Sequence, residues 1–180
     1  LEEGDELVGV RITGGDEDIN LSTKNGLSIR FNEKDVRSMG RTAKGVRGIR
    51  LKADDEVVSV DVLDEETTLL NVTKNGFGKR TKAREYRLQT RGGKGVFTLK
   101  VTPKNGKVVG VLKVTNDDEI IIIANSGKLI RMESKSISLI GRATQGVTLI
   151  KLAENDKVVG IALVAEKDEE DINEDMAEKK

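Results

Sequence analysis

The sequence of 180 residues contains no cysteine and no histidine. The absence of cysteine excludes a disulfide framework, a zinc–thiolate site and a thiol nucleophile, and it suits a reducing cytosol. The absence of histidine removes the usual residue of most general-base arrangements and most transition-metal sites. Together the two absences favour a binding role over catalysis, and we expect no catalytic site, no metal and no cofactor.

Long apolar runs, tryptophan and proline are also scarce. No apolar run reaches the roughly 18 residues of a membrane-spanning helix, so we expect no membrane contact. One proline and no tryptophan argue against WD40 and most other propeller families, whose blades carry aromatic signatures. The few aromatic residues cannot form a stacking platform for single strands, and we expect Phe31, Phe77 and Phe97 to lie in the core.

The net charge of zero conceals an uneven distribution. Residues 166–180 carry eight acidic and three basic side chains, a net charge of −5, which leaves +5 on residues 1–165. A basic body with an acidic tail is typical of proteins that bind polyanions, although a tail that only increases solubility is an equal alternative. The tail has few large apolar groups, so we expect it to be disordered.

The strongest feature is an internal repeat of about 50 residues. Its first anchor is LVGV at 7–10, VVSV at 57–60, VVGV at 108–111 and VVGI at 158–161. Its second anchor is KNG at 24–26, KNG at 74–76 and NSG at 125–127. Its third is GRTAKGV at 40–46, TRGGKGV at 90–96 and GRATQGV at 141–147. All three anchors recur at steps of 50 or 51 residues, which makes chance a poor explanation.

Each repeat predicts four antiparallel strands, so the chain is expected to be all-β with blade-like sheets. In the second copy we expect strands at 45–51, 57–63, 67–73 and 77–81, with a short helical turn possible near 33–39 or 82–87. Asn75-Gly76 predicts a hairpin with a type I′ turn, because both residues tolerate a positive φ.

The predicted domain covers residues 1–165, and it divides into a partial unit at 1–31, full units at 45–81 and 95–132, and a partial unit at 146–164. The chain therefore starts and stops within a unit, and it begins without methionine. Either neighbouring units exchange strands, or the sequence is a fragment of a longer ring of blades.

The third anchor carries a family resemblance. QTRGGKG at 89–95 resembles the gyrase A box, Q-R-R-G-G-K-G, with Thr90 as the one departure. The GRTAKGV and GRATQGV elements resemble degenerate copies of that box. Together with the hairpin sequences and the acidic tail, they make the chain similar to the C-terminal domain of bacterial DNA gyrase A, particularly from Gram-positive bacteria.

The resemblance implies a β-pinwheel, a propeller-like ring whose blades exchange strands. It also implies that duplex DNA bends around a basic rim, without sequence preference, to direct negative supercoiling by an ATP-dependent type II topoisomerase. The implied partners are the rest of gyrase A and the gyrase B protein, in the bacterial cytoplasm at the nucleoid. The equivalent domain of topoisomerase IV and a β-repeat scaffold for protein partners remain alternatives.

Recurring basic residues are the candidate DNA contacts. Those in or beside the third anchor are Arg41, Lys44, Arg47, Arg50, Arg91, Lys94 and Arg142, with Gln89, Gly92, Gly93 and Gly95 of the box. Those near the last strand of a unit are Lys79, Arg80, Lys82, Arg84, Arg87, Lys128 and Arg131. The alternatives are that the anchor arginines bind carbonyl groups at blade junctions, that the glycines meet backbone requirements, and that the second group is a solvated edge.

Other chemistry is weakly indicated. GGKG at 92–95 has the wrong spacing for a nucleotide-binding loop, and no Ser or Thr follows its lysine. The acidic clusters at 54–56 and 117–118 fall in predicted turns, where turn composition explains them. For the tail at 166–180, we expect that its deletion tightens DNA binding at low ionic strength.

Overall fold

The computed structural model describes residues 3–164, so the acidic tail predicted at 166–180 lies outside the described residues. Its strands are β1 (Asp18–Thr23), β2 (Leu27–Asn32), β3 (Val57–Leu63), β4 (Thr68–Thr73), β5 (Phe77–Lys82), β6 (Val96–Phe97), β7 (Val108–Val114), β8 (Glu119–Ala124), β9 (Leu129–Glu133), β10 (Val147–Thr148) and β11 (Val158–Leu163). Its short 3-10 helices are η1 (Glu33–Asp35), η2 (Ala83–Glu85) and η3 (Ser134–Ser136). The prediction of an all-β chain is therefore confirmed.

Three hairpins form the repeated element: β1–β2, β4–β5 and β8–β9. In the first turn the amide of Gly26 donates to the carbonyl of Thr23 over 3.0 Å, and Gly26 has φ +81°. Gly76 and Gly127 repeat this conformation, with φ +80° and +82°. The predicted type I′ turn is wrong, because the asparagine before each of the first two glycines keeps a negative φ. Only the glycine needs the left-handed region, as in a three-residue hairpin loop.

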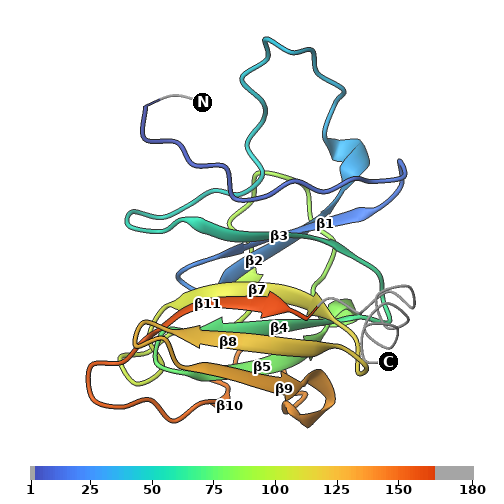
Figure 1. Cartoon of the computed structure of the whole chain (residues 1–180). Coiled ribbons are helices and arrows are strands. Elements are labelled where there is room, and N and C mark those ends of the chain that lie inside the picture. Colours follow the sequence, from blue (N-terminus) through green and yellow to red (C-terminus); the bar gives the residue numbers. More distant parts are fainter. Residues whose placement is uncertain (1–2, 165–180) are drawn as a thin grey trace, which may run out of the picture.

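The sheets combine strands from distant parts of the chain (Figure 1). Their strand orders are β3-β1-β2-β6, β10-β5-β4-β7 and β11-β8-β9. Thus β3 pairs with β1 rather than with β4, and β2 pairs with β6 from the next copy of the repeat. Of the two alternatives that the sequence left open, the structure shows strand exchange between neighbouring units. One copy of the sequence repeat therefore contributes strands to more than one sheet.

Two predicted strand segments do not form strands. Residues 7–10 and 45–51 are copies of segments that pair with the hairpin one repeat earlier, as β7 and β6 do. The described residues before position 7 are too few to supply that hairpin. These segments consequently find no sheet to join within residues 3–164, although their sequences have strand character.

The cores lie between neighbouring sheets and under the loops that cross them. The core between the first two sheets centres on Leu69, Tyr86 and Leu99, and the core between the last two on Leu70, Ile122 and Ile150, all at most 2% exposed. Phe31 is buried as predicted, but Phe97 is 54% exposed because β6 lies at a sheet edge.

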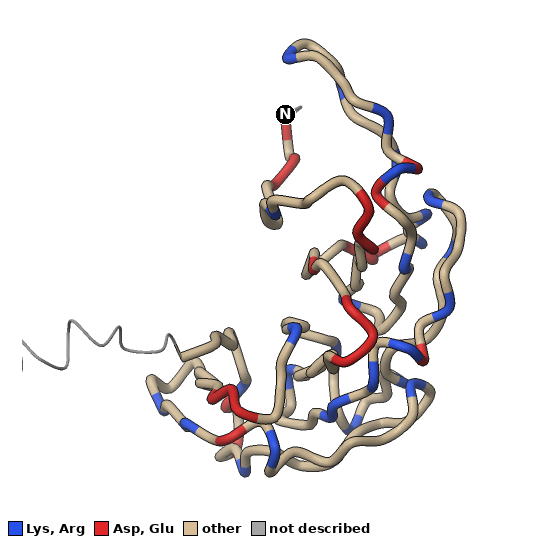
Figure 2. Tube along the Cα trace, turned by 90° about the vertical axis from the view of Figure 1, so that its right-hand side faces the viewer, with Lys and Arg blue, Asp and Glu red and all other residues tan. Residues whose placement is uncertain are grey.

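The stacked sheets form an open arc, with most Lys and Arg on its outer, convex side and most Asp and Glu toward its inner side (Figure 2). Residues 3–164 include no helix that is long and apolar enough to cross a membrane.

Candidate nucleic-acid interface

The third anchor of each repeat lies in a loop that follows a 3-10 helix, and we call the loops at 36–50, 86–100 and 137–151 the rim loops. The second rim loop runs alongside β2, where Gln89 donates its amide to the carbonyl of Arg30 over 2.8 Å. The third runs alongside β5 in the same way, where Ile140 donates its amide to the carbonyl of Arg80 over 2.9 Å. Main-chain pairing therefore holds these two loops against the sheets before them.

Consecutive rim loops also bind one another. Arg91 donates from Nη1 to the carbonyl of Arg47 over 2.6 Å and from Nε to the carbonyl of Asp35 over 3.2 Å. One repeat later, Arg142 donates from Nη1 to the carbonyl of Phe97 over 3.0 Å, and Phe97 is the copy of Arg47. The alternative that the anchor arginines bind carbonyl groups at junctions is thus observed for both residues. These arginines orient the loops, whatever else they contact.

The glycines of the box allow close main-chain approach. A Cβ atom on Gly95 would lie 2.5 Å from the carbonyl oxygen of Ser28, and one on Gly146 would lie 2.7 Å from that of Gly78. Gly92 has φ +79° and donates its amide to the carbonyl of Gly48 over 2.6 Å. The amide of Gly92 is therefore used within the chain, contrary to the prediction that it binds phosphate.

Two further predicted DNA contacts are wrong, because Lys79 and Arg80 are buried. Arg80 is 5% exposed, and it donates from Nε to the carbonyl of Ile137 over 3.1 Å and from Nη1 to Oδ1 of Asn116 over 2.7 Å. Lys79 is fully buried, and its Nζ donates to the carbonyls of Gly141 and Arg142, each over 2.5 Å. Both side chains hold the next repeat in place.

Burial lowers the pKa of Lys79 to about 8, the nearby carboxylate of Glu85 raises it, and the charge of Arg142 lowers it further. Lys79 therefore remains mostly protonated at pH 7 but releases its proton at a lower pH than an exposed lysine does. Even as a neutral amine it retains two N–H donors for its two carbonyl partners.

Arg80 belongs to a series of arginines, each four residues after the hairpin glycine: Arg30, Arg80 and Arg131. Arg30 binds Oδ2 of Asp18 over 2.7 Å and donates to the carbonyls of Ala83 and Tyr86 in the next repeat. Arg131 pairs with Glu119, and within residues 3–164 no further repeat follows for it to bind. Arg131 occupies the same position of the repeat as Arg30 and Arg80, which bind the next repeat. This position weakens the prediction that Arg131 contacts DNA.

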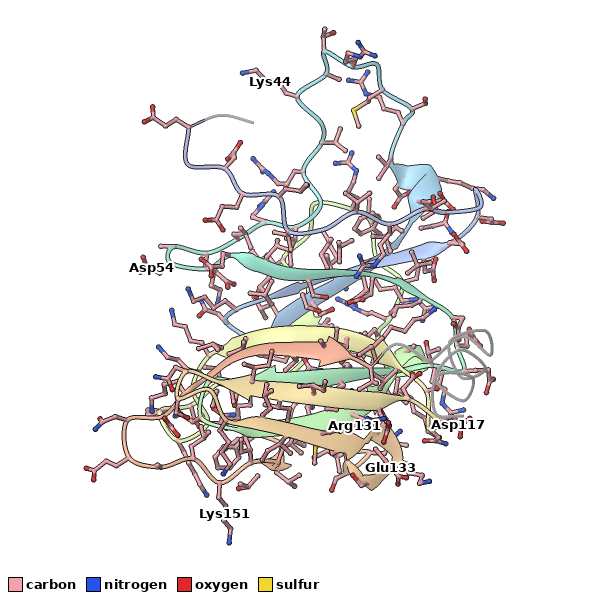
Figure 3. The ribbon with its side chains drawn as sticks, in the orientation of Figure 1. Lys44, Asp54, Asp117, Arg131, Glu133 and Lys151 are labelled. Carbon is pink, nitrogen blue, oxygen red and sulfur yellow. The ribbon has the colours of Figure 1, made fainter. Side chains whose placement is uncertain are left out.

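The other predicted basic residues lie at the surface. Arg41, Lys44, Arg47, Arg50, Arg84, Arg87, Lys94 and Lys128 are exposed, and Lys82 is half-buried. Lys44 lies in the first rim loop, which projects beyond the first sheet (Figure 3). Six of these eight exposed residues lie in the first two rim loops, Arg84 lies in η2, and Lys128 lies in the turn between β8 and β9.

Acidic residues mostly complete turns, as their sequence context indicated. Oδ1 of Asp55 accepts the amide of Asn25 over 2.9 Å, and Oδ2 of Asp118 accepts the amide of Thr115 over 2.6 Å. Within residues 3–164 no group of three or more carboxylates is arranged to hold a metal ion.

Exchanged antiparallel sheets in an arc, with basic loops along its outside, define a propeller-like domain of the β-pinwheel type. The family model described as "DNA gyrase C-terminal domain, beta-propeller" matches residues 19–64, 68–115 and 118–165, and the chain belongs to this family. Each matched segment contains one hairpin, the loop that follows it and the next long strand (β3, β7 or β11), so the match agrees with the observed repeat.

Relatives and solved structures agree with the family. The DNA gyrase A protein of Halalkalibacterium halodurans is 59% identical over 181 residues, which cover 100% of this chain and 22% of that protein. The DNA gyrase A protein of Escherichia coli K12 is 47% identical over 174 residues, 96% of this chain and 20% of that protein. The chain therefore spans about a fifth of the length of these relatives.

Two solved structures share the fold. The C-terminal domain of DNA gyrase A superimposes with a TM-score of 0.76 at 32% identity, over 83% of this chain and 51% of that chain. The C-terminal domain of DNA topoisomerase IV gives a TM-score of 0.88 at 25% identity, over 99% of this chain and 56% of that chain. The chain thus corresponds to about half of each solved domain.

Proposed function

We propose that this chain binds duplex DNA along the convex side of its arc and bends it, as part of a DNA gyrase A protein. The observation that carries the proposal is the stacking of the rim loops. Hydrogen bonds to main-chain carbonyls join consecutive loops, so we expect the Arg and Lys side chains that these loops expose to form one basic band along the arc. A continuous band of cations suits the repeating phosphates of a duplex.

The same geometry favours contact with phosphates over reading of base sequence. The described residues contain no helix longer than three residues, and the rim loops are held against the sheets by main-chain hydrogen bonds. Base readout in the major groove generally needs an inserted helix or β-ribbon. We therefore expect binding that is sequence-nonspecific and dominated by counterion release.

Bending follows from the curvature of the band. A duplex that contacts successive rim loops on the outside of an arc must curve with it, at an elastic cost that the additional phosphate contacts offset. In the intact enzyme, such a bend would direct negative supercoiling, with the rest of gyrase A and gyrase B as partners at the bacterial nucleoid. The 59% identity to a gyrase A favours gyrase over topoisomerase IV, whose C-terminal domain is only 25% identical.

The test is a titration of the chain with two duplexes of unrelated sequence at several salt concentrations, with a fluorophore on each duplex end. We expect similar affinity for both duplexes, a steep linear fall of log K with log salt, and a shorter end-to-end distance on binding. Affinity that is insensitive to salt, or strong preference for one sequence, would overturn the proposal of phosphate binding. An unchanged end-to-end distance would overturn the bending.

A further inference from the structure

Three basic residues occupy one register of the repeat, and the sequence reasoning found only the first. Arg50, Lys100 and Lys151 each follow the anchor glycine by five residues, and they recur at steps of 50 and 51. All three are exposed. We call these residues the second basic row. An alignment of the three repeat copies by their glycines would have found Lys100 and Lys151.

The residue before each member of the row belongs to the core. Ile49, Leu99 and Ile150 are buried, with exposed fractions of 6%, 0% and 2%. Leu99 and Ile150 donate their amides to the carbonyls of Gly26 and Gly76 in the hairpin turns, over 3.3 and 3.2 Å. The chain bends at 48–49, 98–99 and 149–150, and the basic residue that follows each bend is exposed. The side chains of the row therefore lie away from the core.

The next rim loop binds the main chain of Arg50 and of Lys100. Arg50 donates its amide to the carbonyl of Gly93 over 2.8 Å, and Lys100 donates to that of Thr144 over 2.9 Å. The carbonyl of Lys100 also accepts from Nδ2 of Asn105 over 2.9 Å. Each of these two row members thus lies beside the rim loop of the following repeat. Lys44 and Lys151 lie at opposite ends of the arc (Figure 3).

The charges of the row are not neutralised by contact. Within residues 3–164 none of the three side chains forms an ion pair. Other surface cations differ, since Lys24 pairs with Glu56 and Lys34 pairs with Asp16. A cation without a carboxylate partner can bind a phosphate without first breaking an existing contact.

We propose that Arg50, Lys100 and Lys151, the last residues of the three rim loops, form a second row of phosphate contacts, one per repeat. The inference rests on the proposed function, because its ligand is the backbone of the same duplex. Arg50 and Lys100 have anchored main chains and all three side chains are exposed, so the row presents its charges at intervals that the fold sets. Bound DNA then contacts the second basic row as well as the box at 89–95.

The test uses the salt dependence of DNA binding to count the phosphate contacts. Arg50→Gln, Lys100→Gln and Lys151→Gln are made singly and together in the full chain, and duplex DNA is titrated at several salt concentrations. Each lost phosphate contact lowers the slope of log K against log salt by about 0.9, so the triple variant should lose about 2.7. Because all three side chains are exposed, the urea midpoint should stay unchanged.

A triple variant of matched charge provides the control. Lys24→Gln, Lys34→Gln and Lys113→Gln remove three cations that each pair with a carboxylate, so the slope should change little. An equal loss of slope in both triples, or an unchanged slope in the row triple, would overturn the second row. If the unaltered chain itself shows no salt-dependent DNA binding, the proposed function fails instead.

Discussion

Arg91 donates a hydrogen bond from Nη1 to the main-chain carbonyl of Arg47 over 2.6 Å, and so joins equivalent loops of consecutive repeats. Its Nε binds the carbonyl of Asp35 at the same junction. Lys94, in the same box, has an exposed side chain that makes no comparable bond to the main chain within residues 3–164. One box therefore contains a residue that orders the interface and a residue that only presents charge there.

Arg91→Ala and Lys94→Ala should consequently have different effects. Arg91→Ala should weaken DNA binding and also lower the free energy of unfolding by about 1 kcal/mol, since its carbonyl partners are left to water. Lys94→Ala should weaken DNA binding with a stability change within about 0.5 kcal/mol. Urea unfolding and DNA titration of both variants measure the difference. Equal stability of the two variants would show that the Arg91 contacts do not support the loop.

The series Arg30, Arg80 and Arg131 predicts a gradient of stability. Arg80→Ala should cost on the order of 3 kcal/mol, because it leaves Asn116 and the carbonyl of Ile137 without their donor and opens space at the junction. Arg131→Ala removes one exposed ion pair and should cost less than about 1 kcal/mol. Chemical denaturation of the three alanine variants orders them, with Arg30→Ala between the other two. A cost for Arg131→Ala that equals that of Arg80→Ala would contradict the junction role.

The three anchor glycines allow a test of close packing against backbone strain. Gly45, Gly95 and Gly146 all have positive φ, at +84°, +73° and +78°. A Cβ atom on Gly95 or Gly146 would collide with a neighbouring carbonyl oxygen, whereas a Cβ atom on Gly45 would meet no atom within 4 Å. Gly45→Ala should therefore cost about 1 kcal/mol from strain alone, and the other two should cost clearly more. Thermal unfolding that shows three equal losses would assign the whole effect to the backbone conformation.

The hairpins and the repeat were predictable from the sequence, but the strand exchange was not. Each hairpin is a local element, marked by a glycine after alternating apolar residues. Strands β1 and β4 occupy the same position in consecutive repeats, and 57–63 pairs with the distant β1 rather than with the nearby β4. Because only a short turn separates 57–63 from β4, pairing between these two neighbouring strands was the simpler prediction. Residues 45–51 were predicted as a strand because pattern alone cannot show whether a partner strand is within reach.

The candidate interface was predictable in outline, and the errors concern burial. Lys79 and Arg80 form a basic pair that reads as surface charge in isolation. Ile29 and Ile130 occupy the register of Lys79 in the other two copies, and that comparison would have indicated an inward position. The box residues Arg91 and Gly92 bind main chain of the preceding rim loop, which no spacing rule reveals.

The lowered pKa of Lys79 predicts that the stability of the folded chain increases with pH in the alkaline range. Its pKa is lowered from 10.5 to about 8 in the folded chain by burial, although Glu85 raises it in part. Between about pH 8 and pH 10.5 the unfolded chain keeps this proton and the folded chain releases it. The contribution of Lys79 to the free energy of unfolding must therefore rise with pH across this window, by up to about 3 kcal/mol. Lys79→Ile, which places the residue of the other two copies at this register, should remove that rise, whereas Lys94→Ile should retain it. Urea denaturation of the three proteins from pH 7 to pH 10.5 measures the effect, and parallel pH profiles for all three would show that the buried amine keeps its proton throughout.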